Sequence, residues 1–151
     1  MIEYRNILTS ITDVLAANTG GTLDASLTTA VRLISRGDPN NKPVQIDQYP
    51  AIFVQLISKD EDFAQIGQQK KDMTINFDIF GLVQFSDGSD DSDLEVQNLA
   101  RNIESILRTN IRLSQTVLWC NPNSTQFDAA WKDGIWLSAV TVGLECRLLQ
   151  T

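Results

Sequence analysis

The chain has 151 residues, 42% of them hydrophobic, and its 12 basic and 19 acidic residues give a formal net charge of -7. This length predicts one domain, residues 1–151, that can bury a sizeable core without a disulfide or a metal. The acidic balance argues against a nucleic-acid-binding protein and against a protein that docks on an anionic membrane.

The apolar segments argue against a secreted or membrane-spanning protein. The first ten residues lack an apolar core followed by a cleavage site, so we expect no signal peptide. No stretch approaches the roughly 20 apolar residues that a membrane helix needs. We therefore expect a protein that is made and kept in a cytoplasm.

The N-terminal segment predicts a helix followed by a strand. Apolar residues between Ile7 and Leu15 form one stripe at helical spacing, and Asn18–Gly21 is a typical helix end. The segment "TTAVRLISRG" then has the alternation of a strand.

A second strand follows a loop. The turn-forming residues Gly37–Pro43 predict the loop, and Pro50 precedes a strand from Ala51 to Lys59. This strand is apolar on both faces, which favours a position inside the sheet. Asp60–Gln69 is polar and predicts the connection to the next strand.

The third strand, Lys70–Gln84, alternates between apolar and polar residues, as expected for an antiparallel sheet with one packed face. Phe80 and Leu82 break the pattern because they fall on the polar side. Two interpretations stay open: the strand end lies under a loop or helix of the same chain, or a neighbouring subunit covers it.

The C-terminal half predicts a helix and a hairpin. Ser92 and Glu95 have the spacing of a capping box ahead of a long amphipathic helix that ends near Asn110. Two strands follow, Gln115–Asn121 or slightly beyond and Ile135–Leu149. Between them "WKDGIW" contains an Asp-Gly pair typical of a tight turn. The order α-β-β-β-α-β-β predicts an α+β fold, with a mostly antiparallel sheet and two main helices on one face.

No catalytic or cofactor signature accompanies this fold. The chain has no histidine, no phosphate-binding loop and no dinucleotide fingerprint, so we predict no catalytic, cofactor-binding or metal-ligating residues. An acidic cluster could hold a divalent cation, but its spacing does not fit an EF-hand. We favour a solvated loop that leads into a helix N-terminus. The cluster comprises Asp87, Asp90, Asp91, Asp93 and Glu95.

The cysteines and tryptophans have structural interpretations as well. Cys120 and Cys146 lie in apolar strands, so two buried free thiols are favoured, although a cross-strand disulfide stays open. Trp119 and Trp136 are predicted to lie in the core. Trp131, beside the hairpin tip, is either an anchor for a protein partner or folded back over its own sheet.

The order of these segments resembles the tail terminator proteins of tailed bacteriophages, also called tail completion or neck proteins. The resemblance covers nearly the whole chain. It is carried by "YPAIFVQL" after a proline-containing loop, by "KKDMTINFDIFG", by the helix "LEVQNLARNIESILRTN", and by the closing strand "IWLSAVTVGLECRLL".

The resemblance implies a virion protein without enzymatic activity that is assembled in the host cytoplasm. Such proteins form a hexameric ring that caps the tail tube, stops its elongation and offers a surface to the head-completion or connector protein, while genomic DNA passes through. We expect the acidic loop to face the channel. The candidate contacts are Phe80, Leu82 and Trp131 between subunits, and the segment around Phe63 and Ile66 toward the tube.

Two other classes stay open. One is a different neck, head-completion or minor tail protein, which its position in the particle would distinguish. The other is a small-molecule-binding regulatory α+β domain, which would need a concave apolar pocket.

Overall fold

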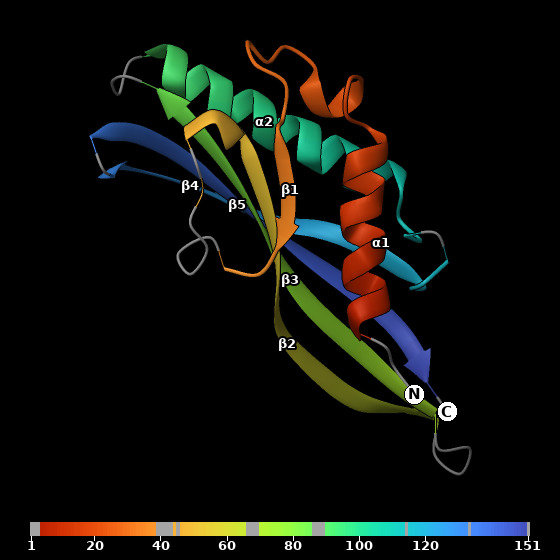
Figure 1. Cartoon of the computed structure of the whole chain (residues 1–151). Coiled ribbons are helices and arrows are strands. Elements are labelled where there is room, and N and C mark those ends of the chain that lie inside the picture. Colours follow the sequence, from red (N-terminus) through yellow and green to blue (C-terminus); the bar gives the residue numbers. More distant parts are fainter. Residues whose placement is uncertain are drawn as a thin grey trace.

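The structure of the protein is a computed structural model, which describes residues 4–38, 44, 46–65, 70–85, 90–113, 115–132 and 134–150. The described strands form one five-stranded sheet in the order β1-β2-β3-β5-β4, with two α-helices beside it (Figure 1). The elements are α1 (Tyr4–Ala17), the 3-10 turns η1 (Thr22–Asp24) and η3 (Ile46–Gln48), β1 (Leu33–Arg36), β2 (Ala51–Gln65), β3 (Lys70–Phe85), α2 (Asp90–Thr109), β4 (Trp119–Lys132) and β5 (Ile135–Gln150).

The sheet is antiparallel except at one edge. β2 pairs with β3, β3 with β5 and β5 with β4, all antiparallel, whereas the short β1 runs parallel to the first residues of β2. The last strand in the chain therefore lies between β3 and β4. The predicted α+β fold with a mostly antiparallel sheet is confirmed.

Both helices cover the same face of the sheet. The apolar stripes of α1 and α2 are buried against alternate residues of β2, β3 and β5, so helical and strand periodicities meet in one core. Such burial of large side chains is the main stabilising contribution in a domain of this size. The largest fully buried members of this core include Ile11, Leu15, Ile52, Ile75, Phe77, Ile79, Leu99, Ile103 and Ile106.

The predicted capping box is wrong. α2 begins at Asp90, so Ser92 lies inside its first turn, and the Ser92 hydroxyl instead makes a buried hydrogen bond with the Ser138 hydroxyl on β5. Glu95 accepts a hydrogen bond from the backbone N–H of Thr28 at 2.7 Å. Both side chains therefore tie α2 to other elements, because the helix starts at Asp90, three residues before the Asp93 that a capping box at Ser92 implies.

The predicted connection over Asp60–Gln69 is also wrong for its first half. β2 continues to Gln65, and Asp60 pairs with Thr74 of β3. Charged residues are compatible with a strand here because β1 pairs only with Ala51–Val54, which leaves the rest of β2 at the sheet edge. Figure 1 shows β2 and β3 extending past α2 as an arm, with β5 paired alongside β3.

The two C-terminal strands form the predicted hairpin, but β4 is longer than expected. Lys132 pairs with Ile135 across the two-residue turn, and Gly134 has the positive φ of 80° that a tight hairpin favours. β4 starts at Trp119 and runs through Pro122, past the predicted end near Asn121, with a bulge before Ser124. Proline is tolerated there because β4 is an edge strand.

The question of the two cysteines is settled as two buried free thiols. Cys120 and Cys146 are direct cross-strand partners on the helix-covered face. A thiol–thiol hydrogen bond lowers the pKa of Cys120 and raises that of Cys146, and burial raises the pKa of Cys146 further. Within the described residues, no helix is both long and apolar enough to cross a membrane.

Candidate interaction surfaces

The edge strand β4 carries two exposed aromatic side chains on the face that the helices occupy. Phe127 pairs with the buried Val140 and is 54% exposed, and Trp131 pairs with Trp136 and is 59% exposed. Ala129 lies between them and is also exposed. We call Phe127, Ala129 and Trp131, with the neighbouring Trp136, the β4 surface. Exposed aromatic residues that share one face are typical of a contact with another protein.

The aromatic rings of the β4 surface are held in place. The Trp131 and Trp136 rings meet edge to face with centroids 5.3 Å apart, an arrangement that aromatic pairs prefer. The indole N–H of Trp136 donates to the Ser138 hydroxyl at 3.2 Å, and Ser138 is itself bonded to Ser92 of α2. Trp131 therefore packs on its own hairpin, as one of the two interpretations predicts, and remains mostly exposed. Its role as an anchor for a protein partner stays a prediction.

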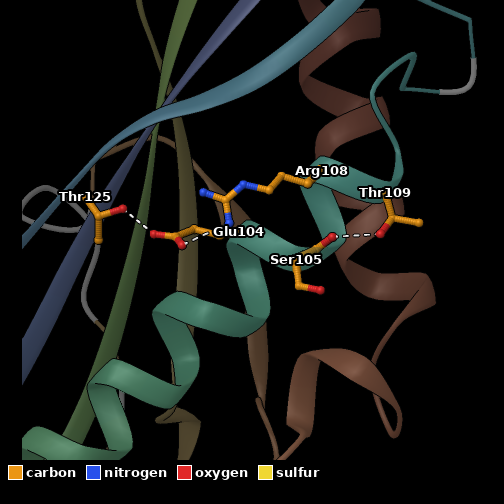
Figure 2. A network of polar contacts seen from close by, with 5 residues as sticks. All are labelled: Glu104, Ser105, Arg108, Thr109 and Thr125. Atoms are coloured by element: carbon orange, nitrogen blue, oxygen red, sulfur yellow. Dashed lines mark hydrogen bonds and ion pairs between the residues drawn. The ribbon is translucent and has the colours of Figure 1, made fainter.

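A polar network ties the middle of β4 to α2 (Figure 2). The Thr125 hydroxyl donates to the Glu104 carboxylate, which also accepts from Arg108 one helical turn later at 3.4 Å. The Thr109 hydroxyl donates to the carbonyl of Ser105 at 2.9 Å and closes the end of the helix. Because Thr125 is two residues from Phe127, this network fixes the β4 surface relative to the helix.

Three backbone positions of β4 cannot donate to a further strand. The N–H of Cys120 donates to the Ile111 carbonyl at 2.6 Å, and Pro122 has no N–H. The N–H of Ala129 donates to the side chain of Asp128 at 2.8 Å. Natural edge strands use such devices against uncontrolled strand addition. A partner of β4 would therefore bind chiefly through the aromatic side chains.

The opposite edge of the sheet carries a groove between α1 and β1. Its volume is about 450 Å³. Ile34 forms part of its floor and packs against the main core, whereas Asp13 and Ala16 are exposed on α1. We call it the α1–β1 groove. Its lining residues are Thr12, Asp13, Ala16, Ile34, Ser35 and Arg36.

The sheet face opposite the helices is acidic. Arg147 on this face pairs with Asp72 at 2.9 Å and stacks on the Trp119 ring, 5.7 Å from its centroid. Partial burial raises the pKa of Asp78. We call this side the open face, because the described helices pack on the other side. Its described acidic residues are Asp60, Asp72, Asp78, Asp128 and Glu145.

The chain matches no protein-family model. No curated protein is significantly similar to it. A function is therefore inferred from these surfaces and from the arrangement of the elements.

Phe80 and Leu82 lie in a second, smaller cluster on the open side. They pair with Phe53 and Ala51 of β2 and are half-buried there, with Tyr49 packed over the same cluster. This arrangement supports the interpretation that the strand end lies under another segment of the same chain. Their role as a subunit contact stays a prediction.

The predicted core positions of two tryptophans are wrong. Trp119 and Trp136 are only half-buried, Trp119 under Arg147 on the open face and Trp136 beside Trp131 at the hairpin end. Both occur on outer strands or near the sheet end, where one side of the indole stays accessible.

The acidic cluster is only partly described. Asp90, Asp91 and Asp93 lie in the first turn of α2 and are exposed, as expected where the helix macrodipole favours acidic residues. Asp87 lies outside the described residues. Among the described residues, no group of three or more acidic or cysteine side chains could hold a metal ion.

The predicted tube contact falls mostly outside what the structure describes. The backbone of Phe63 pairs with Lys71 in the β2–β3 arm, but its side chain is not described, and Ile66 lies outside the described residues. Nearby, Leu56 and Ile57 are 40% and 49% exposed at the start of the arm. These aliphatic residues are a further candidate contact on β2.

A cavity of about 190 Å³ lies between the start of β2, the end of β3 and α2. Arg32, Gln84 and Glu95 are among its lining residues. Ligand sites usually measure about 300–1,000 Å³, so this cavity is smaller than such a site, whereas the α1–β1 groove falls within the range. The small-molecule-binding class stays a prediction.

Sequence reasoning missed Phe127 and the α1–β1 groove. The spacing of Phe127, Ala129 and Trp131 is the period of two that a strand face requires, so the signal was present. It was not used because the strand was predicted to end at or slightly beyond Asn121. The groove has no sequence signal, since it arises from the packing of α1 beside β1.

Proposed function

We propose that this protein is a structural virion protein that forms a hexameric ring, caps the tail tube of a bacteriophage and stops its elongation. The observation that supports a ring most directly is the difference between the two sheet edges. One edge projects exposed aromatic side chains, and the other carries a groove. Unlike surfaces on opposite sides of one subunit are what a head-to-tail contact needs, and such contacts generate rings when the rotation closes.

The partners of the proposed ring are the tail tube protein, a head-completion or connector protein, and genomic DNA that passes without specific binding. The acidic open face supports the proposal that DNA passes through the ring without binding. Carboxylates such as Asp78 and Glu145 repel phosphates and give DNA no stable contact. The proposed location is the neck of the virion, after assembly in the host cytoplasm, and the proposal includes no enzymatic reaction.

The first test is the molar mass in solution, measured by light scattering over a wide range of concentrations. A species near six times 16.8 kDa is the expected result. Purified tail tubes are then incubated with the protein and with fresh tube subunits, and tube lengths are measured by electron microscopy. Tubes that stop growing when the protein is present support the capping role, and tubes that keep growing at the uncapped rate contradict it.

A further inference from the structure

We infer that the β4 surface of one copy docks into the α1–β1 groove of a second copy of this chain. This inference rests on the proposed ring, because it names the two surfaces through which neighbouring subunits meet. Phe127 and Trp131 are the anchors, and the groove beside Ile34 receives them.

The pairing register places these two surfaces at the same level of the sheet. Phe127 pairs with Val140, Val140 with Gly81, Gly81 with Ile52, and Ile52 with Ile34. One row of residues therefore connects the aromatic edge to the floor of the groove. If a second copy lies beside the first with its strands at the same level, the groove of the second copy faces the β4 surface of the first.

The two surfaces also lie on the same side of the sheet. Paired residues in a sheet point to the same face, so Phe127 and Ile34 are both on the helix-covered side. A neighbour can therefore meet Phe127 after a rotation about a ring axis, without turning its sheet over. This relation is head-to-tail, whereas a two-fold axis would bring β4 against β4.

The sizes of the two surfaces are compatible. At 54% and 59% exposure, Phe127 and Trp131 together present roughly 250 Å² of aromatic surface. That is about a third of the roughly 800 Å² that each partner contributes to a stable interface. The strand and α1 would supply the remainder. A groove of about 450 Å³ has room for an aromatic ring.

The β1 segment and the middle of β4 differ in charge. The segment Val31–Arg36 contains two arginines and no acidic residue, whereas Ser124–Trp131 contains Asp128 and no basic residue. Asp13 of α1 also lines the groove, and Lys132 follows Trp131 in β4. Asp128 lies in the row that ends at Leu33, next to Arg32. Charges arranged in this way favour one orientation of the neighbour and oppose contact between two identical edges.

The other exposed apolar residues of β2 fit the β4 surface less well. Leu56 pairs with Phe77, Phe77 with Leu144 and Leu144 with Pro122. The residue level with Leu56 on the β4 edge is therefore a buried proline and not an exposed aromatic ring. Leu56 and Ile57 therefore remain candidate contacts with the tail tube.

The test uses two variants that each destroy one of the two surfaces. The double variant Phe127→Ser, Trp131→Ser removes the anchors, and Ala16→Trp fills the groove from an exposed position of α1. Leu118→Ser, which changes an exposed apolar residue outside both surfaces, is the matched control. Circular dichroism and urea unfolding check that each variant is folded.

Light scattering is expected to show that both surface variants self-associate at least about 30-fold more weakly than the wild type, and that the control does not. Mixed in equal amounts, the two variants should form a heterodimer of twice 16.8 kDa, because each retains one intact surface. The contact is overturned if either variant assembles like the wild type, if the mixture stays monomeric, or if the wild type is a monomer or a simple dimer.

The tube-length assay separates failure of this contact from failure of the proposed function. Wild-type protein that stops tube growth, together with a double variant that stops it equally well, would refute the contact and leave the capping role standing. Wild-type protein that does not stop tube growth refutes the capping role, whatever the mixing experiment shows.

Discussion

At the scale of single residues, Gly81 decides how closely α2 approaches the sheet. A Cβ atom at this position would lie 2.8 Å from the Leu99 Cδ2 atom and 2.9 Å from the Val140 Cγ1 atom. Real Cβ atoms do not come so close to their neighbours, so a side chain here would push the helix away from β3. The glycine is needed for close packing and not for an unusual backbone conformation.

Gly81→Ala is therefore expected to destabilise the protein by about 1–3 kcal/mol through overpacking. Urea unfolding measures the change as a lower midpoint at an unchanged slope. Gly21→Ala is the control, since a Cβ at Gly21 would meet only the Asn18 carbonyl at an ordinary 3.7 Å. Equal urea midpoints for the two variants would show that α2 can move away from β3 without a loss of stability.

Asp78 should make stability depend on pH. Burial raises its pKa above the ordinary value of 3.8, so the folded state binds a proton more readily than the unfolded state does. The contribution of Asp78 to the free energy of unfolding therefore decreases as the pH rises from 3.8 through the raised pKa. Asp78→Asn removes the buried charge and is expected to raise the urea midpoint at pH 7, with the advantage over the wild type shrinking as the pH falls toward 3.8.

Asp91→Asn is the matched control for that measurement. Asp91 is exposed in the first turn of α2, where its charge interacts favourably with the macrodipole. Its removal should lower stability at pH 7 by about 0.3–1 kcal/mol. If both substitutions shift the midpoint in the same direction, burial of Asp78 is not the cause.

At the scale of elements, a single buried amide joins α2 to η1. The Asn102 side chain donates to the carbonyls of Leu23 and Ala25 at 2.9 and 2.8 Å. The residue is almost fully buried, so these carbonyls would lose their partner without gaining water. Asn102→Ala is expected to cost about 1–3 kcal/mol of stability.

Asn98→Ala provides the comparison for Asn102. Asn98 lies one turn earlier on the same helix. Its amide N–H donates to the Ser26 carbonyl at 3.4 Å and its Oδ1 accepts from Arg101 at 3.2 Å, both in exposed positions. Its loss should change the urea midpoint little. Hydrogen exchange of η1 would show faster opening in the Asn102 variant alone, and similar exchange in both variants would contradict the proposed role.

The sequence predicts an element well when the signal for that element is local, and poorly when the element depends on distant parts of the chain. The amphipathic stripe of α1 and the Asp-Gly turn before β5 are local signals, and both were predicted. The continuation of β2 beyond Asp60 depends on backbone pairing with β3, which leaves no apolar pattern in the sequence. For the candidate surfaces, the exposure of Trp131 agrees with its predicted position beside the turn. The α1–β1 groove depends on the distance between two elements and was not predicted.

At the scale of the whole molecule, two acidic regions compete for the channel of the proposed ring. One is the acidic N-terminus of α2, with Asp90, Asp91 and Asp93, and the other is the open face. They lie on different sides of the subunit, because α2 covers the opposite face of the sheet. One ring geometry therefore cannot turn both regions toward the DNA equally.

Charge reversal distinguishes the two regions. Asp60→Lys with Glu145→Lys adds four positive charge units to the open face, and Asp91→Lys with Asp93→Lys adds the same number to the helix N-terminus. The set that lines the channel should retain DNA in the assembled ring, and this binding should weaken between 50 and 200 mM salt, since counterions are released on binding. Fluorescence anisotropy with a short duplex measures it. Equal effects of the two sets would contradict a defined channel wall.

The position of β5 has a consequence for the order in which the protein can be built. β5 follows every other described strand in the chain, yet it lies between β3 and β4. While the chain emerges from the ribosome, β3 keeps one unpaired edge and β4 has no neighbour at all until β5 is made. A chain interrupted before Ile135 therefore lacks the strand that joins β3 to β4, and its unpaired strand edges make it prone to aggregation until synthesis is almost complete.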